Sequence, residues 1–247
     1  MASALHKRAQ RAIERQLAYQ QRKAERVRGH EEAIIDRMKS HSARVRDKLA
    51  ALRPIAADSS VLEVGSGAHG LIFYFDGGRK VGIDPLADQY RELFPAWQGR
   101  ATTIAAYGEE LPFEDSSFDF VLCDNVVDHA ESPRRIVAEI ARVLKPGGLL
   151  YFTVNIHHSV YHWADRAHAG WRALGIPIEV TPFADHTVHL TLDSARALFC
   201  GLPLTVLDEK DTIAATKREK PRIRHAGDRL KRLFFKNAQY ELIAERV

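Results

Sequence analysis

Apolar and polar positions divide the chain into an N-terminal stretch with helical spacing and a longer part in which short apolar runs alternate with helical patterns. From Val27, apolar side chains recur at helical intervals, which predicts an amphipathic helix docked on another surface and broken from a preceding segment near Gly29 and His30. The chain beyond residue 60 contains compact apolar runs typical of buried strands. These predict strands near 61–65, 79–84, 101–106, 118–124 and 148–154.

Helical patterns separate the predicted strands. The run 71–75 predicts a helix that packs back on the sheet, and further helices are expected at 86–94 and 132–144, the latter beginning at Ser132-Pro133 and ending at Lys145-Pro146-Gly147-Gly148. Strand–helix alternation of this kind predicts an α/β fold with a doubly wound, mostly parallel sheet and a ligand at the carboxyl ends of its strands. After a helix capped by Asp193, two late strands are expected at 204–207 and 239–244.

The segment from Val61 to Gly70 carries the most specific local pattern. A short apolar strand leads into Gly65-Ser66-Gly67, where glycine permits a tight turn and close approach of a ligand to the backbone. The spacing also satisfies the dinucleotide fingerprint G-x-G-x-x-G, with Asp84 at the end of the next strand. Glu63, two residues before the first glycine, favours a cationic cofactor over a pyrophosphate, because a carboxylate would repel the latter.

Five sequence elements, in order and at sensible spacing, extend this pattern over roughly residues 61–155. They are LEVGSG at 62–67, GID at 82–84, LPF at 111–113, SFDFVLCDNVVDH at 117–129 and RVLKPGG at 142–148. In these elements the chain resembles the class I S-adenosylmethionine-dependent methyltransferases, in their type 11 group. The resemblance implies a Rossmann-like sheet of seven strands with the last strand antiparallel. It implies S-adenosyl-L-methionine as the cofactor and says nothing about the methyl acceptor.

The resemblance also assigns roles to individual residues. Glu63, Gly65 and Gly67 match the motif that wraps the amino-acid half of the cofactor, and Asp84 matches the acid that holds the ribose hydroxyls. Ala106-Tyr107-Gly108 replaces the family's usual Gly-Asp pair before Glu109. Tyr107 is therefore expected to stack on the adenine, with Glu109 or the backbone accepting from its amine. The full set of candidate cofactor-binding residues is Glu63, Gly65, Ser66, Gly67, Asp84, Pro85, Tyr107, Glu109, Asp124 and Asn125.

Three residues are candidates for a general base, which is needed only if the acceptor must lose a proton. His129 comes first, because it matches a position where the family often has histidine and because imidazole titrates near neutral pH. Asp128 and His157 follow. A purely structural role at the start of a helix is the alternative for His129. His69, which stands where the family has a third glycine, is a further site candidate.

Charge is unevenly distributed in this chain of 247 residues with a net charge of +4. Residues 1–53 carry +8 and residues 217–236 carry +7, so the remainder carries −11. We expect 1–53 to form a basic helical N-terminal extension and 54–247 to form the methyltransferase domain, with a basic insert at 217–236. The extension could be a solvated helix, a homodimer contact, a lid over the cofactor or a polyanion-binding arm.

Composition and hydropathy indicate the cellular compartment in which the protein is expected to work. No apolar run of about 18 residues predicts a membrane span, and the N-terminus has no continuous apolar segment of the kind a secretory signal needs. Cys123 and Cys200 are expected to be reduced, since Cys123 lies in a buried strand. A cytoplasmic protein is therefore expected.

The stretch 155–200 is too long for an ordinary connection and predicts a lid over the site. It holds Trp163, Trp171 and six of the twelve histidines. His158 and His162 have the i, i+4 spacing of a metal pair, but no cysteine or acid cluster accompanies them, so no metal is expected. We expect these side chains to enclose a small acceptor.

Three main functions and one weaker alternative are consistent with the sequence. The first is methyl transfer to an oxygen or nitrogen atom of a small molecule. The second is a nucleic-acid (RNA) methyltransferase that uses both basic stretches to hold phosphates, although their arginines spread around the helix rather than along one face. The third is a non-catalytic cofactor-binding protein, and an oxidoreductase is indicated only by the glycine spacing.

Overall fold

A computed structural model describes residues 2–160, 188–219 and 234–247, and the predicted lid tryptophans lie outside these ranges. Seven strands form one sheet in the order β3-β2-β1-β4-β5-β7-β6. Six strands are parallel, and β7 runs antiparallel to both of its neighbours. The strands are β1 (Ser60–Val64), β2 (Arg79–Ile83), β3 (Thr102–Ile104), β4 (Phe118–Asp124), β5 (Leu144–Ile156), β6 (Leu204–Asp211) and β7 (Ala238–Arg246). The predicted fold class is therefore confirmed.

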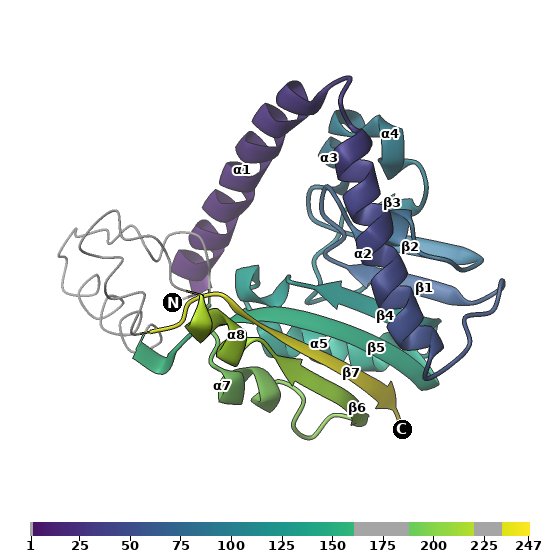
Figure 1. Cartoon of the computed structure of the whole chain (residues 1–247), viewed down its shortest axis with the longest axis vertical. Coiled ribbons are helices and arrows are strands. Elements are labelled where there is room, and N and C mark those ends of the chain that lie inside the picture. Colours follow the sequence, from purple (N-terminus) through teal and green to yellow (C-terminus); the bar gives the residue numbers. More distant parts are fainter. Residues whose placement is uncertain (1, 161–187, 220–233) are drawn as a thin grey trace.

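Helices cover both faces of the sheet (Figure 1). One face packs against α2, a 3-10 turn η1 and the helix pair α3 and α4, and the other face packs against α5 and α7. The helical elements are α1 (Ala2–Val27), α2 (Glu32–Ala50), η1 (Leu71–Phe73), α3 (Ala87–Leu93), α4 (Pro95–Gln98), η2 (Val127–His129), α5 (Pro133–Val143), α7 (Leu192–Ala197) and α8 (Ile213–Arg218). The sheet is thus covered by helices from distant parts of the sequence.

The helix expected at 71–75 is wrong, because only the single turn η1 forms there. Leu71, Ile72 and Phe73 are all buried, and consecutive buried side chains leave no polar face for a longer helix. Gly77 and Gly78 follow within a few residues and turn the chain tightly into β2. The space on this face of the sheet is occupied instead by α2.

The N-terminal helix α2 contributes to the same hydrophobic cluster as the strands. Met38, Val45 and Leu49 are buried, and they belong to a cluster with Val61 of β1 and Leu122 of β4. Lys48 forms an ion pair with Glu241 of β7, at 2.5 Å between Nζ and Oε1. Amphipathic docking, predicted from the spacing of apolar residues, is therefore confirmed, and the surface on which the helix docks is the sheet itself.

Two predicted element boundaries are also corrected. Thr191, rather than Asp193, caps α7, and its hydroxyl accepts a hydrogen bond from the Ser194 backbone N–H in a capping box. The sequence Lys145-Pro146-Gly147-Gly148 does not separate α5 from its strand, because β5 begins directly after α5 at Leu144. Gly147 adopts a positive φ of 73° there, which lets the backbone turn sharply without leaving the strand.

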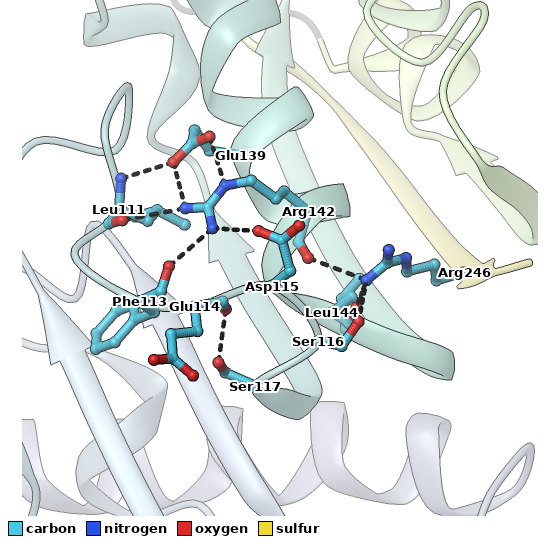
Figure 2. Close-up of polar contacts among 10 residues, drawn as sticks. All are labelled: Leu111, Phe113, Glu114, Asp115, Ser116, Ser117, Glu139, Arg142, Leu144 and Arg246. Carbon is cyan, nitrogen blue, oxygen red and sulfur yellow. Dashed lines mark hydrogen bonds and ion pairs between the residues drawn. The ribbon is translucent and has the colours of Figure 1, made fainter.

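Arg142, within the RVLKPGG motif, holds the loop that carries the LPF motif (Figure 2). Its guanidinium donates to the Leu111 and Phe113 carbonyl oxygens and to the carboxylates of Glu139 and Asp115. Glu139 in turn accepts from the Leu111 backbone N–H at 2.9 Å. The two sequence motifs therefore contact each other and together fix the loop that connects β3 to β4.

Candidate active site

A cavity of about 630 Å³ lies at the carboxyl ends of β1, β2 and β4. Such a volume falls within the range of ordinary small-ligand sites. Its walls come from the glycine loop after β1, the turn after β2, the loop after β3 and the segment after β4. Helix α1 supplies one further wall through Ile13, Arg15, Gln16 and Tyr19. The predicted position of the ligand at the strand ends is thus matched by a cavity there.

The glycine loop packs tightly against the segments that follow β2 and β4. Gly65 has a φ of 73°, and a Cβ atom there would lie 2.4 Å from Val126 Cγ2. The backbone N–H groups of Gly65 and Ser66 both donate to the Ile83 carbonyl oxygen, at 2.8 and 2.9 Å. The loop is therefore tied to the end of β2, and only glycine fits at its first position.

Helix α4 holds the same loop from outside, through residues that the sequence gave no reason to select. Trp97 Nε1 donates to the Ala68 carbonyl oxygen at 2.7 Å. Gln98 Nε2 donates to the carbonyl oxygens of Gly67 and Ala68, at 3.1 and 3.2 Å. Both side chains are buried, so the loop is rigidly supported. Trp97 and Gln98 follow Phe94-Pro95 in the sequence, and no motif around this pair identifies them as part of the site.

Asp84 links the glycine loop to the turn after β2. One of its carboxylate oxygens accepts from the Gly67 N–H at 3.1 Å, and the other accepts from the Leu86 N–H at 2.8 Å. Burial raises the pKa of Asp84 to about 6. Each carboxylate oxygen retains a second lone pair, and the residue lines the cavity. A vicinal diol in the cavity could donate hydrogen bonds to these oxygens, and this role of Asp84 stays a prediction.

Glu63 does not line the cavity. Its carboxylate is buried beneath the glycine loop, where it accepts from the backbone N–H groups of Leu71 and Ile72 at 3.0 and 2.9 Å. Burial, with smaller contributions from the negative charges of Asp124 and Asp84, raises its pKa to about 8. Glu63 is therefore a positioning residue for the η1 turn. The negative charge that faces the cavity comes from other acids, Asp84, Glu109 and Glu131, which line it.

The remaining cofactor candidates fall into two groups. Pro85, Tyr107, Glu109 and Asn125 line the cavity, whereas Ser66 and Asp124 do not. Asn125 has a φ of 58°, an uncommon conformation that asparagine tolerates better than most residues. Glu109 accepts from the backbone N–H groups of Glu131 and Ser132 ahead of α5, at 3.0 and 3.3 Å. Contact of these residues with a cofactor stays a prediction.

Two of the three candidate bases are neighbours, and the third lies apart from them. His129 lines the cavity and is half-exposed, with its Nε2 atom 3.9 Å from Asp128 Oδ1. Asp128 itself is fully buried, and its backbone oxygen accepts from the Val188 N–H. His157 is buried away from the cavity, where its Nδ1 accepts from the Asn237 N–H at 3.2 Å. Of the three, His129 is the one placed to meet a substrate in this cavity.

Asp124 ends β4 next to the cavity and is fixed from two sides. Its carboxylate accepts from the Thr153 hydroxyl, and its other oxygen lies 3.7 Å from Nδ1 of His41 on α2. Within the described residues, no three histidine, cysteine, aspartate or glutamate side chains gather as a metal site would require. None of the helices described is long and apolar enough to cross a membrane.

Comparison with known proteins agrees with this geometry. The family profile described as "Methyltransferase domain" matches residues 62–152. A thiol S-methyltransferase of Rattus norvegicus is 34% identical over 108 residues, which are 41% of this chain and 44% of the relative. The matched stretches span about two fifths of the length of the curated relatives.

Two solved structures share the fold. The YcgJ protein of Bacillus subtilis aligns with a TM-score of 0.60 at 18% identity, over 84% of this chain and 98% of that one. The geranyl diphosphate C-methyltransferase of Streptomyces coelicolor, solved with S-adenosyl-L-homocysteine, aligns with a TM-score of 0.57 at 15% identity, over 83% and 77%. The profile match shows that residues 62–152 form a methyltransferase domain, and the strand order of the sheet agrees with the Rossmann-like fold of the two solved structures.

Proposed function

We propose that the protein is an S-adenosyl-L-methionine-dependent methyltransferase that acts on an oxygen or nitrogen atom of a small molecule. The observation that carries the proposal is the cavity in which the Gly65–Gly67 loop and the Asp84 carboxylate face the same space. Glycine at position 65 lets the loop pack against Val126, and the Asp84 carboxylate offers paired acceptors for a ribose diol. These features fit the adenosine half of the cofactor.

The charge at the cavity supports a cationic cofactor over a dinucleotide. Asp84, Glu109 and Glu131 line the cavity, and Asp124 lies beside it. Several carboxylates near one site attract an ammonium or sulfonium group and repel a pyrophosphate. Arg15 is the one lysine or arginine in the described lining of this cavity.

The chain's own residues have three tasks in such a reaction. When bound, the cofactor supplies a methyl group on a good leaving group, so alignment and exclusion of water dominate. The rigid glycine loop and Asp84 fix the donor, and Tyr19 of α1 forms part of the wall that separates it from water. His129 is positioned to take a proton from an acceptor hydroxyl or amine that must lose one.

Binding of the demethylated product tests this proposal. S-adenosyl-L-homocysteine should bind the full chain in calorimetry, and NAD should not. Asp84→Asn should weaken the binding by roughly 10- to 100-fold, the scale expected for hydrogen bonds to a charged group. Asp88→Asn, an exposed acid on α3, is the matched control and should bind as the unaltered protein does. Binding of NAD without binding of S-adenosyl-L-homocysteine would refute the proposal.

A further inference from the structure

A second cavity of about 510 Å³ lies between α1, α2 and the far side of the glycine loop. Lys23 and Arg26 of α1 and Arg37 and His41 of α2 contribute to its walls, and His69 of the loop closes it. The cavity shares Tyr19 with the first cavity, so the two adjoin. It is formed by the N-terminal helices, the part of the chain whose role the sequence left open.

The charge in this second cavity is strongly positive. Lys23, Arg26 and Arg37 all line it, and in the described part of the chain no carboxylate forms an ion pair with any of the three. Burial, together with the positive charges of Arg37 and Arg26, lowers the pKa of Lys23. Like charges held close together destabilise one another unless an anion joins them. An anionic ligand would remove that cost.

His69 adds a neutral polar contact to the same wall. Its ring packs against Phe94 and Trp97, with centroids 5.0 and 5.4 Å away. Burial and the nearby charges of Lys23 and Arg37 lower its pKa to about 3, so the ring is uncharged at neutral pH. Its Nε2 atom is buried and has no hydrogen-bond partner within the described structure. A ligand oxygen could therefore be recognised by shape and hydrogen bonding as well as by charge.

One residue in the wall of the second cavity contacts the end of β4, near which methyl transfer is expected. His41 lies in its wall and contacts Asp124, the residue immediately before the cavity-lining Asn125. A molecule anchored between α1 and α2 would therefore extend toward the strand ends and the first cavity. This is the direction from which an acceptor must approach a donor held by the glycine loop.

The number of cations indicates what kind of anion fits. The α-carboxylate of an amino-acid cofactor carries one negative charge and stands next to its own ammonium group, so it does not require three cations. Two arginines and a lysine suit a phosphate ester or diphosphate, which offers more charge and several acceptor oxygens. A nucleic acid would need a long open groove of clustered positive charge rather than a local cavity.

We propose that this cavity between α1 and α2 binds the phosphate-bearing end of a small methyl acceptor. The proposal rests on the proposed methyltransferase function, because it names the acceptor of that same site. It assigns Lys23, Arg26 and Arg37 to anchoring the acceptor, and it assigns Asp84 and the glycine loop to the cofactor alone.

Calorimetry with inorganic pyrophosphate on the full chain saturated with S-adenosyl-L-homocysteine tests the assignment. Pyrophosphate should bind this complex, and acetate should bind at least about tenfold more weakly. Lys23→Met and Arg37→Gln should each raise the dissociation constant for pyrophosphate about tenfold or more, since each removes one charged hydrogen-bond donor. Arg22→Gln on α1 and Arg44→Gln on α2 remove the same charge outside the cavity and should change it less than about twofold.

Each other outcome has a definite reading. Absence of pyrophosphate binding, or equal binding by all variants, overturns the proposal. Loss of S-adenosyl-L-homocysteine affinity in Lys23→Met and Arg37→Gln would instead assign the cavity to the cofactor, and mutual exclusion of the two ligands would do the same. Tighter binding of a short single-stranded RNA, weakened by the same variants, would replace the small acceptor by a nucleic acid. If S-adenosyl-L-homocysteine fails to bind while pyrophosphate binds as expected, the cofactor assignment fails and the anion site stands.

Discussion

Replacement of Glu63 by glutamine should change how the stability of the protein depends on pH. The Glu63 carboxyl is buried, and its pKa is raised from 4.5 to about 8. Between these values the folded state binds a proton that the unfolded state releases. The contribution of Glu63 to stability is therefore fully present below pH 4.5 and is lost as the pH rises through 8.

The raised pKa sets the size of this effect. A shift of about 3.5 units corresponds to about 5 kcal/mol over the whole titration, of which roughly 3 kcal/mol falls between pH 5.5 and pH 9. Glutamine does not titrate, but it offers one acceptor oxygen where the carboxyl group faces two backbone N–H groups. Loss of one buried acceptor costs about 1–3 kcal/mol at every pH. The unaltered protein should therefore be the more stable at pH 5.5, and Glu63→Gln should equal or exceed it at pH 9.

Urea unfolding followed by tryptophan fluorescence measures this crossover, since Trp97 is buried against the glycine loop. The quantity to follow is the difference in unfolding free energy between the two proteins at each pH, because the titration of other groups such as Asp84 is common to both. Glu110→Gln, with an exposed side chain, is the control and should show a flat difference. A flat or rising advantage of the unaltered protein from pH 5.5 to pH 9 would refute the reasoning.

Two further substitutions probe the framework of the site. Gly65→Ala should destabilise the fold by about 2–4 kcal/mol in urea unfolding, because it combines a positive φ with a clash against Val126. The control Gly201→Ala has the same φ in open space and should cost about 1 kcal/mol. Equal costs for the two variants would contradict the clash. Arg142→Lys should cost about 1.5–3 kcal/mol because lysine cannot reproduce the guanidinium contacts to two carbonyls and two carboxylates. The exposed Arg135→Lys on the same helix should stay within about 0.5 kcal/mol, and an Arg142→Lys protein as stable as that control would argue against an anchoring role.

Much of the sheet was predictable from the sequence because its strands are buried on both faces. Val61–Val64 and Phe118–Asp124 are mostly apolar runs, and such runs are typical of strands in a parallel sheet covered on both faces. Asp84 was identifiable for a similar reason, since a carboxylate directly after such a run must lie at the ligand edge. Local pattern and tertiary position agreed at these residues.

Other features depend on contacts between distant segments and left no local pattern. The apolar run at 71–75 predicts a helix, but only a single turn forms there, and α2 packs on that face of the sheet. Trp97 and Gln98 support the glycine loop across about 30 residues of sequence, as their hydrogen bonds to Ala68 show. Glu63 was predicted to face the cofactor, but its carboxylate accepts from buried backbone N–H groups in a turn that the sequence did not predict.

The ion pair between Lys48 and Glu241 has a consequence for how the chain reaches its folded state. These two residues are separated by 193 positions, and Arg53 similarly donates to the Gly147 carbonyl oxygen across 94 positions. Helix α2 leaves the ribosome long before β5 and β7, the strands on which it rests, have been made. Until they arrive, its apolar face has no partner and is open to a chaperone or to another chain. Sheet completion, and with it both cavities bordered by the N-terminal helices, should therefore be a late event of synthesis rather than an early one.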